Sequence, residues 1–310
     1  MLDTHRFLHF NLTHTGTGED NHYIDIGLLL SRANRRFYRQ GMNYHVANIV
    51  FDDSDGDADI DVCTLPNTWM TQAAWQKGFQ EWNKQQVALE KASGVKRGKW
   101  LDFRIDMTKN ARDDVDNINL IDANGNTFPV GDSDYSRYQI ANDSSNVIEC
   151  HDIYMMGSIT GSAPDYTGIG LLECLEWALG DDPQEDPDLH THFDILPWQY
   201  LSGDSANSEV NEEVAEDWEE FQDNPPYNAL VVPGADTAGS GRPSSPWVVR
   251  SCKLKTGALS AAVGGFTAPC GLLMIESDSS TDGNSIGVTI ELTPGDYKGV
   301  HAWPMRGGGE

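Results

Sequence analysis

Basic residues are scarce in this chain of 310 residues. It has 21 Lys and Arg against 48 Asp and Glu, a formal net charge of −27 at pH 7. A charge of this size repels polyphosphate and argues against the usual basic class of nucleic-acid-binding proteins. We therefore expect no direct sequence-specific contact with nucleic acid. The acidic residues are spread along the chain, a distribution also typical of halophilic proteins, because salt screens their repulsion.

Cysteine is also sparse. The five cysteines are an odd number, lie far apart in the sequence and lack the CxxC spacing of a zinc ribbon. No disulfide framework can be inferred from such a pattern, which predicts isolated buried thiols. They are Cys63, Cys150, Cys174, Cys252 and Cys270.

Long apolar runs are missing as well. No stretch reaches the ~18 apolar residues that a membrane-spanning helix requires. The most apolar helical stretch, residues 169–179, contains Glu173 and Glu176. The first six residues are polar, so we expect no secretory leader.

Short alternating segments are the main positive signal. Residues 44–51 and 60–65 flank an acidic turn and predict a hairpin, and residues 286–292 alternate cleanly. Residues 262–265, Ala-Val-Gly-Gly, are predicted to lie in a turn. Many short strands with long loops predict a mainly β sandwich or jelly roll.

Helical periodicity occurs in three places. Residues 69–91 place Trp75, Phe79 and Trp82 on one face, and we predict that these aromatic side chains pack on a sheet. Residues 100–107, which follow, are predicted to form a strand. Shorter helices are predicted at 170–179 and 209–222, and the second is acidic outside its apolar stripe.

The acidic turn after residue 51 suggests a calcium site. Asp53, Asp55 and Asp57 alternate along the chain, so their carboxylates could converge on one hard cation. The spacing does not match an EF-hand, because its sixth position is Ala58 and its twelfth is Thr64. A solvated loop tip is the alternative, and no other cofactor is expected.

One cluster of arginines opposes the general acidity. Arg32, Arg35, Arg36 and Arg39 lie within eight residues of one another. They could contact phosphate or lipid headgroups. The alternative, which the excess of carboxylates favours, is ion pairing within the chain or between subunits.

No sequence motif indicates catalysis. A P-loop and GxGxxG are both missing from the sequence, and paired carboxylates cannot be singled out among so many acids. The close pair His190 and His192 could bind a metal if both lay on one strand, but no HExxH accompanies it. We therefore expect no enzyme and name no catalytic residue.

Three stretches carry a resemblance. They are SRANRRFYRQGMNYHVANIVF at 31–51, CTLPNTWMTQAAWQKGFQEWNKQQ at 63–86 and VTIELTPGDYKGVHAWPM at 288–305. Together they resemble the major capsid proteins of small icosahedral single-stranded DNA viruses, and the nearest group is the lipid-containing phages that infect Flavobacterium. The stretches cover about a fifth of the chain.

The resemblance implies a fold and a place in a virion. It implies a double jelly roll, here divided into residues 1–156 and 157–310, with 164–227 as an acidic helical insertion. A single jelly roll with insertions is the alternative, because about a dozen strand candidates occur where two rolls need about sixteen. The resemblance further implies trimers that tile an icosahedral shell. Their partners would be neighbouring trimers, penton or minor capsid proteins, and an internal membrane.

Two other functions remain open. Nine tryptophans could supply stacking platforms for sugars in an extracellular carbohydrate-binding or adhesion module. The histidine pair would instead suit a metal-dependent hydrolase. Exposed aromatic residues on a sheet face would favour the sugar-binding module, whereas burial of Trp75, Phe79 and Trp82 on a helix favours the capsid protein.

Overall fold

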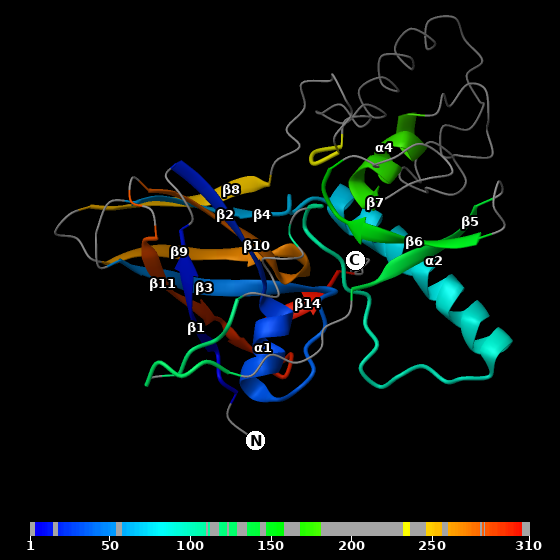
Figure 1. Cartoon of the computed structure of the whole chain (residues 1–310), viewed down its shortest axis with the longest axis horizontal. Helices are drawn as coiled ribbons and strands as arrows, with labels where there is room; N and C mark the ends of the chain where they lie inside the picture. The colour runs from blue at the N-terminus through cyan, green and yellow to red at the C-terminus, as the bar shows by residue number, and fades with distance from the viewer. Residues whose placement is uncertain are drawn as a thin grey trace, which may run out of the picture. The chain divides into compact units, whose positions relative to one another are not determined.

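A computed structural model gives the architecture (Figure 1). It describes residues 4–14, 18–53, 58–109, 111, 118–122, 124–128, 135–142, 147–157, 168–180, 232–235, 246–255, 260–279, 281 and 283–305. The chain divides into two compact units. One comprises Met1–Glu173 with Pro233–Glu310, and the other Cys174–Val232.

The first sheet of the larger unit is antiparallel. In it β1 (Phe7–Thr13) pairs with β11 (Ser285–Leu292), β11 pairs with β3 (Met42–Asp53), and β3 pairs with β9 (Ser260–Ala268). The short β14 (Ala302–Pro304) pairs with the start of β3. Strands from both ends of the chain therefore lie side by side.

The second sheet, also antiparallel, has the order β2 (Gly18–Asp25), β10 (Leu272–Ser279), β4 (Ala58–Thr64) and β8 (Trp247–Leu254). Counting the eight main strands along the chain, the two sheets have the orders 1-8-3-6 and 2-7-4-5. This is the strand order of a jelly roll. The prediction of a mainly β protein is confirmed.

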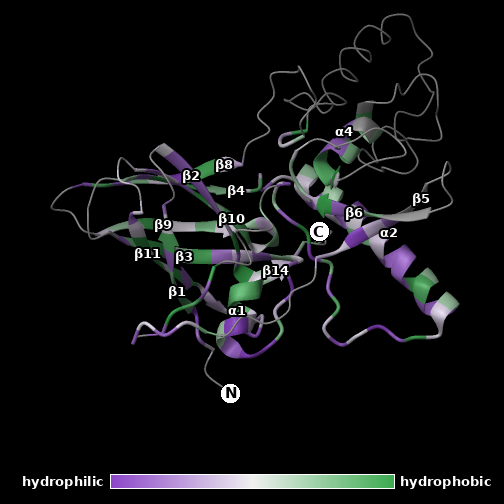
Figure 2. Ribbon diagram, in the orientation of Figure 1, coloured by the Kyte–Doolittle hydropathy of each residue, from purple (hydrophilic) through white to green (hydrophobic). Residues whose placement is uncertain are grey.

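Alternation along the strands builds the core between the sheets. In β1 the buried residues Leu8, Phe10 and Leu12 alternate with exposed ones, and β11 repeats the pattern. The same cluster contains Ile60 and Val62 of β4 and Leu273 of β10. Figure 2 shows apolar residues between hydrophilic ones along these strands. Burial of this apolar area is the main stabilising term of the sandwich.

The predicted hairpin of residues 44–51 and 60–65 is wrong. Both strands exist, as β3 and β4, but β3 pairs within the first sheet and β4 within the second. Each strand turns one apolar face to the common core. Alternation shows that a strand has one buried face, but not which strand lies beside it.

Residues 65–246 are inserted between β4 and β8. The insertion contains α2 (Trp69–Ser93), β5 (Arg137–Asn142), β6 (Val147–Tyr154), β7 (Gly168–Gly170) and α4 (Leu171–Gly180). A three-stranded sheet forms from β5 and β6, which are antiparallel, and β7, which is parallel to β6. Short elements complete the chain after β9: η2 (Pro269–Gly271), β12 (Pro294–Gly295) and β13 (Gly299–Val300).

The two predicted helices in this insertion that fall on described residues are present. Thr68 caps α2 by accepting the Thr71 N–H, and Gly94 ends it in the left-handed conformation at φ 69°. The helix predicted at 170–179 is α4, and in the smaller unit the Glu176 carboxylate accepts the Val232 N–H at 3.0 Å. The helix predicted at 209–222 lies outside the described residues. No helix in the described ranges has the length and apolar character needed to cross a membrane.

The observed organisation differs from the predicted division at residue 156. Each sheet combines strands from residues 7–64 with strands from residues 247–304, so each draws on both predicted domains. The larger unit likewise joins residues before 173 to those after 233. The eight main strands of the described residues form one sandwich of two antiparallel sheets.

The predicted turn at residues 262–265 is instead part of β9. A Cβ atom added to Gly265 would lie 2.9 Å from the Val46 carbonyl oxygen of β3, whereas one added to Gly264 would meet nothing within 4 Å. Close approach of the two backbones therefore explains one glycine of the pair.

We predict that Gly265→Ala lowers the free energy of unfolding by about 1–3 kcal/mol, because the new methyl group meets backbone that is fixed in the sheet. The matched control is Gly264→Ala, which should be neutral or up to ~1 kcal/mol stabilising, since alanine restricts the unfolded chain. Urea unfolding of the two variants checks this. Equal effects would contradict the close approach.

Candidate functional site

A basic turn follows the helix that connects the two sheets. Helix α1 (Ile26–Asn34) begins at Asp25, whose carboxylate accepts the Leu28 N–H at 2.9 Å. It ends at Arg35, which adopts the left-handed conformation at φ 50°. This conformation is uncommon for a residue other than glycine, asparagine or aspartate. Residues 35–39 then lead into β3.

The four predicted arginines differ in their burial and in their partners. Arg32 is buried and donates to the Ile118 carbonyl oxygen at 3.0 Å. Arg39 forms an ion pair with Asp102 at 3.0 Å. Arg35 and Arg36 are exposed, and neither forms an ion pair with any residue that the structure describes. Arg39 thus follows the expected intrachain pairing.

A distant lysine joins this turn. Lys298 donates to the Phe37 carbonyl oxygen, and its ammonium lies over the Tyr38 and Tyr297 rings. Burial lowers the pKa of Lys298, and the positive charges of Arg39 and Arg36 lower it further. Three cations therefore crowd one region. Burial raises the pKa of Asp102, the carboxylate in this region, although Arg39 and the Gln40 N–H act in the opposite direction.

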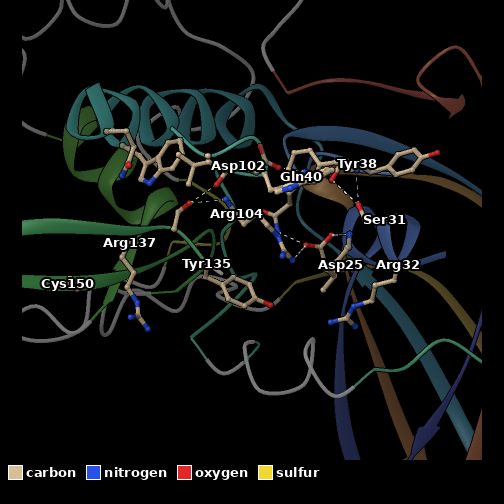
Figure 3. Close-up of a pocket in the computed structure, with 18 of the residues that line it drawn as sticks. Asp25, Ser31, Arg32, Tyr38, Gln40, Asp102, Arg104, Tyr135, Arg137 and Cys150 are labelled. Atoms are coloured by element: carbon tan, nitrogen blue, oxygen red, sulfur yellow. Dashed lines mark hydrogen bonds and ion pairs between the residues drawn. The ribbon is translucent and has the colours of Figure 1, made fainter. Parts of the chain in front are cut away.

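A cleft of about 750 Å³ lies beside the turn. Asp25 and Arg104 point toward each other there, with the Tyr135 ring nearby (Figure 3). The Arg104 Nη2 lies 2.8 Å from the Asp25 Oδ2, and the Gln40 amide donates to the same oxygen at 3.1 Å. The Gln40 side chain also accepts the Ile105 N–H at 2.7 Å. This buried network joins α1 and the start of β3 to the insertion.

The predicted aromatic face of α2 packs differently from the prediction. Trp75 and Trp82 are buried and Phe79 is half-buried, and all three rings surround the buried Phe103 at centroid distances of 5.4–5.8 Å. Phe103 belongs to an irregular segment, where the sequence predicted a strand. The helix contacts the sheet at Gly78, whose carbonyl accepts the Tyr138 hydroxyl at 2.9 Å. Helical spacing identifies a buried face, but not what covers it.

Exposed apolar side chains lie next to the basic turn. Trp100 is 63% exposed and its ring meets Phe37 edge-on at 5.7 Å. The Lys99 ammonium lies 4.7 Å from the centre of the Trp100 ring, and Leu101 is 39% exposed. We define the basic patch as these side chains together with the two exposed arginines of the turn and Lys298. Its members are Arg35, Arg36, Phe37, Lys99, Trp100, Leu101 and Lys298.

Carboxylates line the outer surface of the second sheet. Cross-strand pairing places Asp278 of β10 between Glu19 of β2 and Asp59 of β4, and Glu276 beside Asp61. We call these five residues the acidic face. Burial raises the pKa of Glu276, as do the negative charges of Glu19, Asp61 and Asp278. Lys253 of β8 pairs with Asp59 at one edge.

The two proposed metal sites cannot be located. Asp55 and Asp57 lie outside the described residues, as does the Asp53 side chain, and so do His190 and His192. Within the ranges that the structure does describe, no group of three or more His, Cys, Asp or Glu side chains could hold a metal ion.

Sequence reasoning missed several residues of this region. Asp25, before the apolar run that starts at Ile26, carried a recognisable N-cap signal. Gln40, Arg104 and Lys298 carried none, because the fold brings them to the turn from distant parts of the chain. Chemically, the basic patch offers cations and aromatic faces to an anion or to an acidic surface.

Comparison with known proteins adds no assignment: no protein-family model, curated protein or solved structure matches the chain.

Loss of the buried ion pair should strongly destabilise the fold. We predict that Arg104→Met lowers the free energy of unfolding by about 3–5 kcal/mol, because the Asp25 carboxylate stays buried without its cation. The matched control is Arg137→Met, which removes the exposed 2.7 Å pair with Asp152 and should cost less than ~1 kcal/mol. Denaturant unfolding separates the two, and similar losses would argue against a structural role for the buried pair.

The crowding of cations predicts a change in titration. Arg36→Gln removes a like charge, which favours protonated Lys298, so its pKa should move up toward the ordinary 10.5. Titration of the lysine Nζ followed by nuclear magnetic resonance measures this, with Lys298→Arg to assign the signal. Arg137→Gln is the control and should leave the signal unchanged. An unchanged pKa in Arg36→Gln would mean that burial and Arg39 lower it without a contribution from Arg36.

Proposed function

We propose that this chain is the major capsid protein of an icosahedral virus. The observation that carries the proposal is the strand order 1-8-3-6 and 2-7-4-5, because the jelly roll is a recurrent fold of viral capsid domains. Lectins and cupins share the fold, so further features must support the choice.

The interior of the sandwich favours a structural role. Bulky side chains such as Phe10, Phe51 and Ile49 fill the space between the sheets and are at most 1% exposed. The roll is therefore a rigid core, and the long insertion between β4 and β8 carries most of the additional elements. A shell subunit needs such a core with edges and loops free for neighbours.

The composition supports the same role. Lys and Arg are scarce in the sequence, 21 against 48 Asp and Glu, which suits a shell that does not grip its genome directly. The sequence resemblance favours trimers, penton or minor capsid partners and an internal membrane, and all of these belong to the proposal. The double jelly roll that the resemblance implies remains part of it, although one roll with a large insertion suits the described strands better.

The oligomeric state tests the proposal. Purified full-length protein should form trimers in analytical ultracentrifugation and closed shells or curved sheets in electron micrographs. Assembly should increase from low to moderate salt, because salt screens the repulsion between subunits of charge −27. Urea-unfolded protein returned to buffer provides a control for non-specific aggregation.

A strict monomer at every salt concentration would overturn the proposal.

The second candidate, a carbohydrate-binding module, gains support from Trp247, which is 42% exposed on the edge strand β8. Glycan-array binding by a monomer that is lost in Trp247→Ala would favour it.

A further inference from the structure

We propose that copies of this chain join head to tail, with the basic patch of one copy bound to the acidic face of the next. This inference rests on the proposed assembly function and names the surfaces that would carry it. Both surfaces lie within the larger unit, on described residues.

The basic patch has the composition of a protein interface. Arginine, tryptophan and phenylalanine are enriched in interfaces, and the arginines and tryptophans among them carry much of the binding energy. Trp100 is anchored on one side by its edge contact with Phe37 and presents the rest of its ring to solvent. It therefore enters a contact with few conformations to lose.

The charge of the basic patch calls for an acidic partner. Arg35 and Arg36 have no ion pair with described residues, and Lys298 is held near two arginines at the expense of its own proton affinity. The chain supplies carboxylates in excess, since no Lys or Arg occurs between Arg137 and Arg242. A second copy is therefore the complementary partner closest to hand.

The acidic face brings carboxylates of neighbouring strands close together, so that they repel one another. Like charges directly opposite each other on neighbouring strands destabilise a sheet, and Asp278 has an acidic neighbour on both sides. A cationic surface laid over these rows would relieve the repulsion. Arginines can do so through two hydrogen bonds to each carboxylate.

The positions of the two surfaces set the type of contact. Strand β2 begins beside Glu19 in the acidic face and ends at Asp25, from which α1 leads into the basic turn. The surfaces thus lie toward opposite ends of β2 and differ from each other. A contact between unlike surfaces is heterologous, and it closes into a ring when the rotation between copies permits.

Charge reversal tests the contact. Arg35→Glu with Arg36→Glu should weaken self-association ~100-fold in sedimentation, because it places like charges across the interface. Glu19→Lys with Asp278→Lys should weaken it by a similar factor. The chain carrying all four substitutions keeps the charge of −27 and should regain most of the association. Trp100→Ala should weaken it ~10-fold without any change of charge.

A matched control separates the contact from net charge. Lys84→Glu with Lys91→Glu makes the same change in net charge on exposed positions of α2 and should have a much smaller effect. Far-ultraviolet circular dichroism checks that each variant folds. An assembling wild type whose association survives the arginine reversal, or a fourfold variant that is not rescued, would overturn the inference and leave the capsid proposal standing.

A lipid surface is the other possible occupant of the basic patch. Flotation with vesicles of phosphatidylglycerol and phosphatidylcholine distinguishes it. If the arginine reversal abolished vesicle binding and left sedimentation unchanged, the patch would bind lipid and the inference would be wrong. A wild type that stays monomeric would overturn both the inference and the capsid proposal.

Discussion

The buried carboxylate of Asp25 is the constraint on which the functional region depends. It caps α1 by accepting the Leu28 N–H, and it holds the Arg104 guanidinium and the Gln40 amide in the same small space. An unpaired buried charge is strongly destabilising, so these partners must all be in place in the folded state. The helix after β2, the start of β3 and the first part of the insertion are therefore fixed together. This network therefore fixes the segments on both sides of the basic turn and the residues that line the cleft beside it.

The jelly roll and its insertion have different structural roles. Eight strands bury a continuous apolar cluster, and their connections other than the one between β4 and β8 are comparatively short. Because β4 and β8 are neighbours in one sheet, a long insertion between them leaves the pairing of the remaining strands undisturbed. The insertion contributes Phe103, which packs against α2, and Arg104, which pairs with Asp25. The chain thus forms a rigid scaffold from the eight strands, and the insertion adds a contact region next to it.

Local pattern predicted the elements better than their arrangement. The alternation of residues 286–292 and the periodicity from Trp69 to Lys91 identified β11 and α2, because each depends on side chains close together in sequence. The pairing of β3 and β4 was wrong, since both strands bury a face in the same core without touching through hydrogen bonds. Strand β9 was missed because two glycines weaken its pattern, although one of them is required by the approach of Val46. For the site, the arginine run was visible, whereas Lys298 and Arg104 reach it only through the fold.

The overall charge and the basic patch act over different distances. At physiological ionic strength the Debye length is about 8 Å, so the far field of the acidic chain is largely screened before two copies touch. At contact, the outcome depends on which groups face each other and on how far water is excluded around them. In the contact proposed above, a chain with a large net negative charge therefore associates through the local cations Arg35, Arg36 and Lys298. Scarcity of basic residues makes such contacts selective, because an acidic surface has few other places on the molecule to bind.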